Sequence, residues 1–540
     1  MSAVIGADAL RAALLDGQEI ALLDVREEAH FGPQHILLAI HLPLSLLELR
    51  AAWLVPRRST RIVLCDGAGE GLAERTAGIL EGHGYGSIAL LDGGVAAWRA
   101  AGHATFSGVN VPSKAFGEVV EQGYRTPSIS PHELKAKIDG RENIVVVDSR
   151  PLDEFRVMSI PTATCVPGGE LVWRIGALAP DPDTLVVVNC AGRTRSIMGA
   201  QSLINAGIPN RVVALRNGTM GWHLAGLALD HGQTRYLPEV SPAQAEHARR
   251  RAQAVCARFA VPRIERATLK TWQAEPGRTT FLLDVRSPEE FLAGHLPGSI
   301  AAPGGQLVQA TDRYVGTLRA RLVLVDDDGV RAAMTASWLK QMALHEVAVL
   351  DGGLGGVSLE TGPGPERALG LEALRYREIG PDALRDALAT GRTQLVDLTR
   401  SVAYRTGHIE GARHGVRTRL AALIPELPAH DLLVLTSGDA MLARYAVAEA
   451  EALTDAEVMV LAGGNEAWRA AGLPLAAGED GLEADPVDAH LRAYDCTTNV
   501  EEAMQAYLDW EVDLINRLDE DGTLPFRRDG IAGAYGGQGA

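Results

Sequence analysis

Two short signals each recur four times in this chain, and their spacing constrains the fold more than any other feature. The first is an aspartate directly after an apolar run, found at Asp24, Asp148, Asp284 and Asp397. The second is a glycine-containing turn after a later apolar run, found at residues 92–94, 216–218, 351–353 and 462–464. Successive aspartates lie 124, 136 and 113 residues apart, which is the size of a domain. The sequence therefore predicts four tandem copies of one domain.

Strand-like and helix-like patterns alternate within each copy. This alternation indicates an α/β fold in which a parallel sheet has helices on both faces. Sites in such folds lie at the carboxyl ends of the strands. The first signal and a cysteine-containing loop both follow strand ends, so they can meet at that edge.

Composition shifts give the expected boundaries. The four copies are predicted at residues 1–105, 128–235, 264–360 and 375–478. Residues 106–127 and 361–374 are predicted linkers, and residues 236–263 a helical linker with its helix over 243–259.

The last segment, residues 479–540, is predicted as a helical tail with a disordered, Gly-rich end at 530–540. The tail helix is expected over residues 485–519. Its apolar face is predicted to hold Met504, Leu508, Val512 and Ile515.

The overall composition excludes several classes of protein. A net charge of −17 argues against nucleic acid or an anionic membrane as partner. The apolar runs are shorter than the ~18 residues of a membrane span, and no signal peptide is visible. Five scattered cysteines without zinc-site spacing suit a reducing cytoplasm and predict no metal site. We therefore expect a cytoplasmic protein.

The loop after the apolar run 185–188 carries the strongest chemical signal. Cys190 follows the predicted strand, and Ser196 is a plausible N-cap for a helix over residues 197–206. Backbone N–H groups at such a turn form an anion cradle. A helix N-terminus and neighbouring arginines, here Arg193 and Arg195, lower the pKa of a thiol. Cys190 is therefore predicted as a nucleophile.

This loop resembles the active-site loop of the rhodanese (sulfurtransferase) family. Its six residues are Cys190, Ala191, Gly192, Arg193, Thr194 and Arg195. Related cysteine phosphatases need Cys-x5-Arg, but here Ser196 stands at that distance and Arg195 comes one residue early. The resemblance implies that residues 191–196 bind the sulfur donor and that a sulfur atom is carried on Cys190.

A second stretch extends the resemblance to most of the chain. The family pattern Asp-x-Arg … Glu-Phe … Gly-His-Ile-x-Gly-Ala is fullest at residues 284–299, and copies one, two and four keep parts of it. Asp148 and Arg150 are the corresponding pair in copy two. We interpret such pairs as structural, with the buried Asp and Arg bound to each other and to the following Glu.

The other copies can be compared at the nucleophile position, about 40 residues after the Asp signal. Copy one has Cys65, followed by Asp66 and Glu70, whose carboxylates oppose thiolate formation. Cys65 therefore remains only a possible second nucleophile. Copy three has Asp326 or Asp327 there, and copy four has Thr436 or Ser437. Copies three and four are predicted to be inactive.

The resemblance implies a sulfurtransferase that needs no cofactor. Cys190 would take a sulfane sulfur from a small-molecule donor such as thiosulfate, hold it as a persulfide and pass it to cyanide or a thiol. The alternative is a sulfur carrier or scaffold whose degenerate copies bind an acceptor protein. Phosphatase or arsenate-reductase chemistry is disfavoured by the length of the loop.

Overall fold

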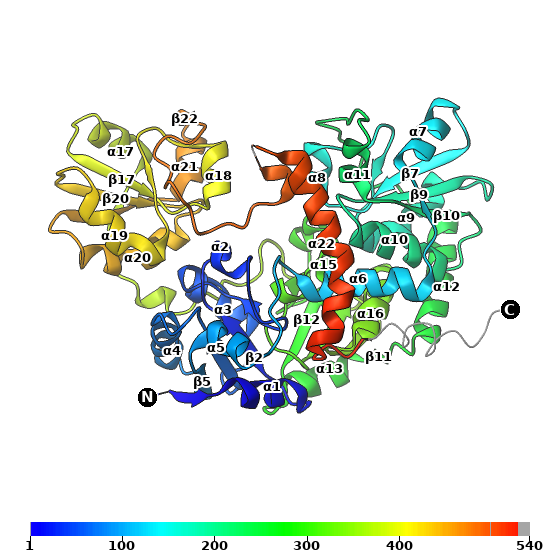
Figure 1. Ribbon diagram of the computed structural model, residues 1–540, viewed down its shortest axis with the longest axis horizontal. Coiled ribbons are helices and arrows are strands. Elements are labelled where there is room, and N and C mark those ends of the chain that lie inside the picture. Colours follow the sequence, from blue (N-terminus) through cyan, green and yellow to red (C-terminus); the bar gives the residue numbers. More distant parts are fainter. Residues whose placement is uncertain (1, 497, 527–540) are drawn as a thin grey trace. The chain divides into compact units, whose positions relative to one another are not determined.

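The computed structural model describes residues 2–496 and 498–526, and these form two compact units (Figure 1). One unit comprises residues 1–10, 21–109 and 367–490, which hold most of copy one and all of copy four. The other comprises residues 11–20, 110–366 and 491–540, with copies two and three. The sequence prediction of four α/β copies and a helical tail is confirmed.

Each copy contains a five-stranded sheet with the same strand order and only parallel pairs. The orders are β1-β5-β4-β2-β3, β6-β10-β9-β7-β8, β11-β15-β14-β12-β13 and β16-β21-β20-β17-β19. The central strands are short apolar runs, as expected when helices cover both faces.

The strands of the first unit belong to copies one and four. They are β1 (Ala3–Ile5), β2 (Ala21–Asp24), β3 (Ile40–His41), β4 (Ile62–Cys65), β5 (Ile88–Leu91), β16 (Glu378–Ile379), β17 (Thr393–Asp397), β19 (Arg413–His414), β20 (Leu432–Thr436), β21 (Glu457–Leu461), and the antiparallel pair β18 (His408–Ile409) and β22 (Leu475–Ala476). The α-helices of these copies are α1 (Ala7–Leu15), α2 (Glu28–Phe31), α3 (Leu47–Leu54), α4 (Leu72–Gly82), α5 (Gly94–Ala100), α17 (Pro381–Leu388), α18 (Ser401–Thr406), α19 (Leu420–Leu423), α20 (Met441–Glu451) and α21 (Gly464–Ala470).

The second unit has the corresponding strands in copies two and three, but in copy three turns at residues 351–356 replace the helix that follows the last strand of the other copies. Its strands are β6 (Ser128–Ile129), β7 (Ile144–Asp148), β8 (Thr164–Cys165), β9 (Leu185–Asn189), β10 (Val212–Leu215), β11 (Arg263–Ile264), β12 (Thr280–Asp284), β13 (Ile300–Ala301), β14 (Arg321–Val325) and β15 (Glu346–Leu350). Its domain helices are α7 (Pro131–Asp139), α8 (Leu152–Val157), α9 (Leu171–Leu178), α10 (Thr194–Asn205), α11 (Gly218–Leu224), α13 (Arg266–Gln273), α14 (Pro288–Ala293), α15 (Gly304–Gln309) and α16 (Arg331–Met342).

Three further helices of the second unit lie outside the copies. They are α6 (Val111–Tyr124), α12 (Pro242–Arg258) and α22 (Val500–Asp521). Helix α12 agrees with the prediction for residues 243–259, whereas α6 is a mostly buried helix within the predicted linker 106–127. In Figure 1 the red α22 crosses the blue α6, and the two helices are packed together.

The tail helix is shorter at its start than predicted. In the described part of this stretch, residues 485–496 and 498–499, the only helical element is a 3-10 turn at Ala493–Asp495, and α22 begins at Val500. Pro486 disfavours a helical conformation of Asp485. The residues after it contact copy four instead of forming a helix: Val487 is buried, and Asp488 accepts a hydrogen bond from the N–H of Ser401 at 2.6 Å. Met504, Leu508 and Ile515 are buried as expected, but Val512 is exposed. The predicted disordered end, 530–540, lies outside the described residues.

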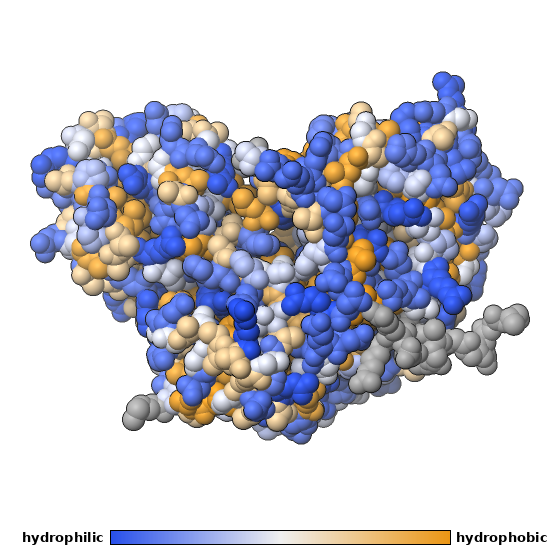
Figure 2. Space-filling view, in the orientation of Figure 1, coloured by the Kyte–Doolittle hydropathy of each residue, from blue (hydrophilic) through white to orange (hydrophobic). Residues whose placement is uncertain are grey.

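The surface in view is mainly polar, with apolar side chains dispersed among polar ones (Figure 2). No helix within residues 2–496 or 498–526 has both the length and the apolar sequence required to cross a membrane.

Candidate active site

The strand β9 delivers Cys190 to the carboxyl edge of the sheet in copy two. Val186, Val187 and Val188 are fully buried, and Cys190 is the first residue after the strand. The following helix, α10, begins at Thr194, which is earlier than predicted. Ser196 is therefore not the N-cap. It lies in the first turn, where its hydroxyl donates a 2.8 Å hydrogen bond to the carbonyl of Arg193.

The glycine-containing turn of copy two holds this loop from the other side. Thr219 donates hydrogen bonds to the carbonyl of Cys190 from its backbone N–H and its hydroxyl, both at 2.8 Å, and Met220 N–H donates to Ala191. Gly218 has a φ of 55°, and a Cβ atom there would collide with the carbonyl of Cys190. The second repeated signal is therefore a support for the nucleophile loop, which explains its glycine.

The Cys190 thiol is almost completely shielded from solvent, with 2% of the residue exposed. Its Sγ lies 3.5 Å from the hydroxyl of Ser196. Burial raises the pKa of Cys190, and the nearby Arg195 and the hydrogen bonds of Ser196 only partly oppose that effect. The sequence-based expectation of a lowered pKa is therefore wrong for this structure, because desolvation outweighs the positive charge.

Arg195 is held by Glu154 rather than by the centre of the loop. Its Nη1 and Nη2 donate to the two carboxylate oxygens of Glu154 at 2.8 and 2.7 Å. Burial alone would raise the pKa of Glu154, but the charge and hydrogen bonds of Arg195 lower it to about 2. This pair corrects the expectation that the Glu of the repeated pattern binds the neighbouring Arg150.

Arg193 points away from the thiol towards helix α6. It donates a bidentate pair of hydrogen bonds to Glu118, at 2.9 and 2.7 Å, and also pairs with Glu121. Burial raises the pKa of Glu118 to about 7, although Arg193 opposes that shift. In this geometry Arg193 anchors the loop to α6.

The predicted structural pair lies beside the loop. Arg150 donates to the two carboxylate oxygens of Asp148 at 2.9 and 2.7 Å, and also to the carbonyl of Met158 at 2.7 Å. Asn189, the residue before the nucleophile, donates from Nδ2 to Asp148 at 2.8 Å. The pair thus connects the ends of β7 and β9 through charge-assisted hydrogen bonds.

The remaining loop residues contact the tail helix, which the sequence analysis did not place here. Ala191 packs in an apolar cluster with Leu508. A Cβ atom on Gly192 would lie 2.9 Å from Oε2 of Glu511. Thr194 donates from its hydroxyl to Oε1 of Glu511 at 3.1 Å. No sequence signal links these residues, because Thr194 and Glu511 are 317 positions apart.

Strand register shows which residue replaces Cys190 in each other copy. In copy two Asp148 pairs with Asn189, and Cys190 follows. In copy one Asp24 pairs with Cys65, so Cys65 corresponds to Asn189 and the nucleophile position falls to Asp66. Cys65 is thus the last residue of a buried strand. Burial raises its pKa well above the ordinary value, and Asp24 adds to the shift.

The same comparison of strand register identifies the residue at the nucleophile position in copies three and four. The position is Asp326 in copy three and Ser437 in copy four, since Val325 and Thr436 pair with the aspartates of the first signal. The turn glycines agree: Gly94, Gly353 and Gly464 approach the carbonyls of Asp66, Asp326 and Ser437, as Gly218 approaches Cys190. The inactivity of copies three and four stays a prediction.

The aspartates at this position accept hydrogen bonds from the backbone of their own loops. Asp66 accepts from the N–H groups of Gly69 and Glu70 at 2.8 and 3.1 Å. Asp326 accepts from Gly329 and Ala332 at 3.1 and 2.9 Å. The loop architecture therefore directs backbone donors at an anion in the position that Cys190 occupies in copy two.

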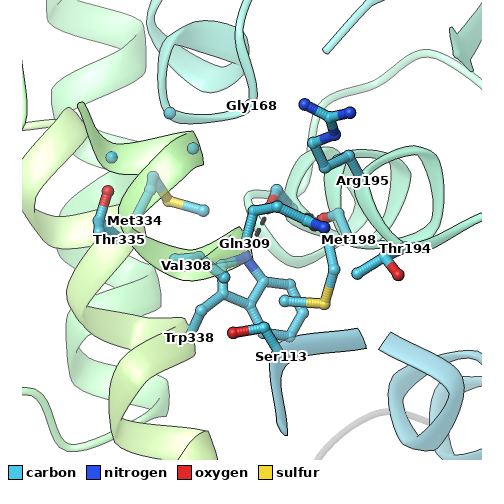
Figure 3. Close-up of a pocket in the computed structure, with 15 residues that line it drawn as sticks. Ser113, Gly168, Thr194, Arg195, Met198, Val308, Gln309, Met334, Thr335 and Trp338 are labelled. Atoms are coloured by element: carbon cyan, nitrogen blue, oxygen red, sulfur yellow. Dashed lines mark hydrogen bonds between the residues drawn. The ribbon is translucent and has the colours of Figure 1, made fainter. Parts of the chain in front are cut away.

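A pocket lies between copies two and three, next to Arg195 (Figure 3). Helix α10 and helix α16 face each other across it. Its labelled lining residues are Ser113, Gly168, Thr194, Arg195, Met198, Val308, Gln309, Met334, Thr335 and Trp338. Most of the lining is apolar or glycine, and Cys190 is not part of it. Trp173 and Arg174 do not line it either, and Arg174 binds Glu170 at 2.7 Å.

No group of three or more His, Cys, Asp or Glu side chains in the described residues is arranged to hold a metal ion. None of the five cysteines forms a disulfide, and Cys256 is buried in α12.

Comparisons with known proteins agree with the repeated fold. A model of the rhodanese-like domain matches residues 7–101, 130–225, 265–360 and 380–471. The crystal structure of a thiosulfate sulfurtransferase from Pseudomonas aeruginosa is 51% identical, covers 97% of this chain and 99% of that chain, and has a TM-score of 0.93. No curated protein matches the chain.

Two further solved structures match with low TM-scores. The Alr3790 protein from Anabaena sp. is 30% identical over 20% of this chain and 84% of its own, with a TM-score of 0.19. The anaerobic ergothioneine biosynthesis enzyme from Chlorobium limicola is 18% identical over 68% of this chain and all of its own, with a TM-score of 0.23. Because the family model covers more than half of the sequence, this chain belongs to the rhodanese family and contains four tandem rhodanese-like domains.

Proposed function

We propose that the protein transfers a sulfane sulfur from a donor such as thiosulfate to a thiophilic acceptor, through a persulfide on Cys190. Membership of the rhodanese family and the similarity to a thiosulfate sulfurtransferase support sulfurtransferase activity in general. The single observation that carries the specific proposal is that a thiol occupies the centre of one loop only. Copies one, three and four have Asp66, Asp326 and Ser437 at that position.

The proposed reaction has two covalent steps. The Cys190 thiolate attacks the outer sulfur of thiosulfate, the bond between the two sulfur atoms breaks, and sulfite leaves with the bonding electron pair. The persulfide then gives its outer sulfur to cyanide or a thiol, and Cys190 leaves as a thiolate. Such a sequence predicts ping-pong kinetics.

The loop backbone supports both steps. In the related loops the N–H groups converge on the carboxylates of Asp66 and Asp326, so equivalent groups in residues 191–196 can stabilise a thiolate or persulfide at Cys190. Arg195 adds a positive charge that lowers the pKa of Cys190 against the effect of burial.

Thiocyanate formation from thiosulfate and cyanide tests this proposal. Wild type, Cys190→Ser and Cys65→Ser are assayed side by side at equal concentration. The proposal expects Cys190→Ser to lose activity to background and Cys65→Ser to keep it. Full activity in Cys190→Ser would refute the assignment of the nucleophile.

A further inference from the structure

Helix α22 covers the nucleophile loop of copy two. Leu508 and Met504 are buried against Ala191, and Tyr507 approaches Gly192. The helix also packs on α6, which itself contacts Thr194 through Gly117 (Figure 1). Ala191, Gly192 and Thr194 therefore lie under a segment that is distant in the sequence, directly after the buried Cys190.

The carboxylate of Glu511 is the polar group that this helix presents to the loop. Glu511 is 2% exposed. Its Oε1 accepts hydrogen bonds from Thr194 at 3.1 Å and from the hydroxyl of Tyr507 at 3.0 Å. Its Oε2 is buried without a hydrogen-bond partner among the described residues. The two donors on Oε1 fix the carboxylate so that Oε2 faces Gly192.

A buried carboxylate oxygen without a donor is costly, so its position calls for an explanation. The charge of Glu511 adds to the effect of burial, which is the main cause of the raised pKa of Cys190. Lys114 is the nearby cation that offsets part of this charge; its Nζ lies 5.1 and 4.9 Å from the ring centres of Tyr507 and Trp510. Burial lowers the pKa of Lys114 to about 8, against the effect of Glu511.

The two loop arginines do not neutralise Glu511 through hydrogen bonds. Arg195 is paired with Glu154, and Arg193 with Glu118 and Glu121. A doubly charged donor that enters the loop therefore meets the negative charge of Glu511. A substrate that carries a proton on sulfur instead offers Oε2 the hydrogen bond that it lacks.

We propose that Glu511 is a specificity-determining residue of the Cys190 site. Its negative charge disfavours dianionic sulfur compounds, and its Oε2 favours thiols because it accepts their S–H proton. This inference rests on the proposed persulfide chemistry and names the acceptor class. A thiol R–SH gives its proton to Glu511 as its sulfur attacks the outer sulfur of the protonated Cys190 persulfide. The bond between the two persulfide sulfurs breaks, R–S–SH leaves, and the Cys190 thiolate takes the proton back from Glu511.

Separate measurement of the two half-reactions tests the inference. Reduced full-length protein is loaded with thiosulfate, and the gain of one sulfur is followed by intact mass. The loaded protein is then discharged with dithiothreitol or with cyanide. Glu511→Gln is expected to load about tenfold faster at low salt, because a repulsive charge is removed. Its discharge to dithiothreitol is expected to slow by about a hundredfold, because the proton acceptor is lost.

Discharge to cyanide is the internal reference, because cyanide transfers no S–H proton. The rate of cyanide discharge in Glu511→Gln is expected to equal or exceed the rate in wild type. Glu502→Gln, which removes one exposed carboxylate from the same helix, is the matched control and is expected to behave as wild type. Tyr507→Phe removes one donor to Oε1 and is expected to shift thiol discharge in the same direction by a smaller factor.

The outcomes separate the inference from the function on which it rests. If wild type never gains sulfur on Cys190, the persulfide proposal fails, and with it this inference. If wild type gains sulfur but Glu511→Gln slows discharge to thiol and to cyanide by the same factor, Glu511 does not determine specificity. The same conclusion holds if Glu511→Gln slows neither discharge. Slower thiosulfate loading in Glu511→Gln would also overturn the inference.

Discussion

At the scale of single residues, the four loops differ in the atom that their backbone donors surround. In copies one and three that atom belongs to a carboxylate, Asp66 or Asp326, which accepts the loop N–H groups. In copy two it is the Sγ of Cys190, which meets Ser196 at 3.5 Å. In copies one and three the aspartate carboxylates occupy the backbone N–H groups of the loop. In copy two the equivalent N–H groups can stabilise a thiolate or persulfide, so sulfur transfer is expected there.

The buried state of Cys190 predicts a strong pH dependence of sulfur loading. Its raised pKa means that the thiol is largely protonated near neutral pH, and the thiolate fraction grows about tenfold per pH unit below the pKa. The loading rate with thiosulfate is expected to follow this slope from about pH 6 to pH 7.5. Stopped-flow loading across that range measures it. A rate that is already level at neutral pH would mean that the thiol pKa is not raised in solution.

The Glu154–Arg195 pair predicts a second pH effect, on stability. The pKa of Glu154 is about 2 in the folded protein, below its ordinary value, so the pair stabilises above about pH 4.5 and this contribution is lost as the pH falls towards 2. Glu154→Gln is expected to cost about 2–3 kcal/mol near pH 6 and progressively less at about pH 3. Thermal unfolding of both proteins checks this; an equal difference at both pH values would contradict the pairing.

At the scale of elements, the tail helix α22 packs against the loop residues that follow the nucleophile. Leu508 is 2% exposed in the apolar cluster with Ala191. Replacement by Ala removes about 2–4 kcal/mol of packing free energy and weakens the docking of α22. Leu508→Ala is therefore expected to increase the alkylation rate of Cys190, measured by peptide mass spectrometry.

Val512 lies on the same helix but is exposed, so Val512→Ala is the control for this experiment. It is expected to leave alkylation of Cys190 unchanged. Equal alkylation rates in Leu508→Ala and wild type would show that α22 does not limit access.

The elements also show what the sequence could predict and what it could not. The place of Cys190 directly after a buried strand was predictable, because an apolar run followed by Cys-Ala-Gly-Arg is a local signal. Its role as nucleophile stays a prediction. The structural position of Cys65 could not be predicted. Cys65 lies 41 residues after its Asp signal and Cys190 lies 42 residues after its own. Only the strand register shows that this difference of one residue places Cys65 in a strand and Cys190 in the following loop. Glu511 could not be predicted, because its role depends on a contact between distant segments.

At the scale of the whole molecule, copy three contributes to the unit that contains the nucleophile. Arg331 of copy three binds Glu170 of copy two at 2.7 Å, in addition to Glu290 of its own copy. Gly168 and Gly169 approach Gly304 and Gly305 closely, and helices of both copies line the pocket beside Arg195. Four tandem copies were predictable from the repeats, but this mutual support follows only from packing.

The assignment of Cys190 as the sulfur-carrying residue is tested by the number and position of sulfur atoms that the intact chain gains on exposure to thiosulfate without an acceptor. The account predicts one added sulfur per chain, located on the peptide that contains Cys190, and its loss on addition of cyanide. Cys190→Ser is expected to gain none, and Cys65→Ser is expected to gain one. A sulfur that persists in Cys190→Ser, or that resides on Cys65, would contradict the account.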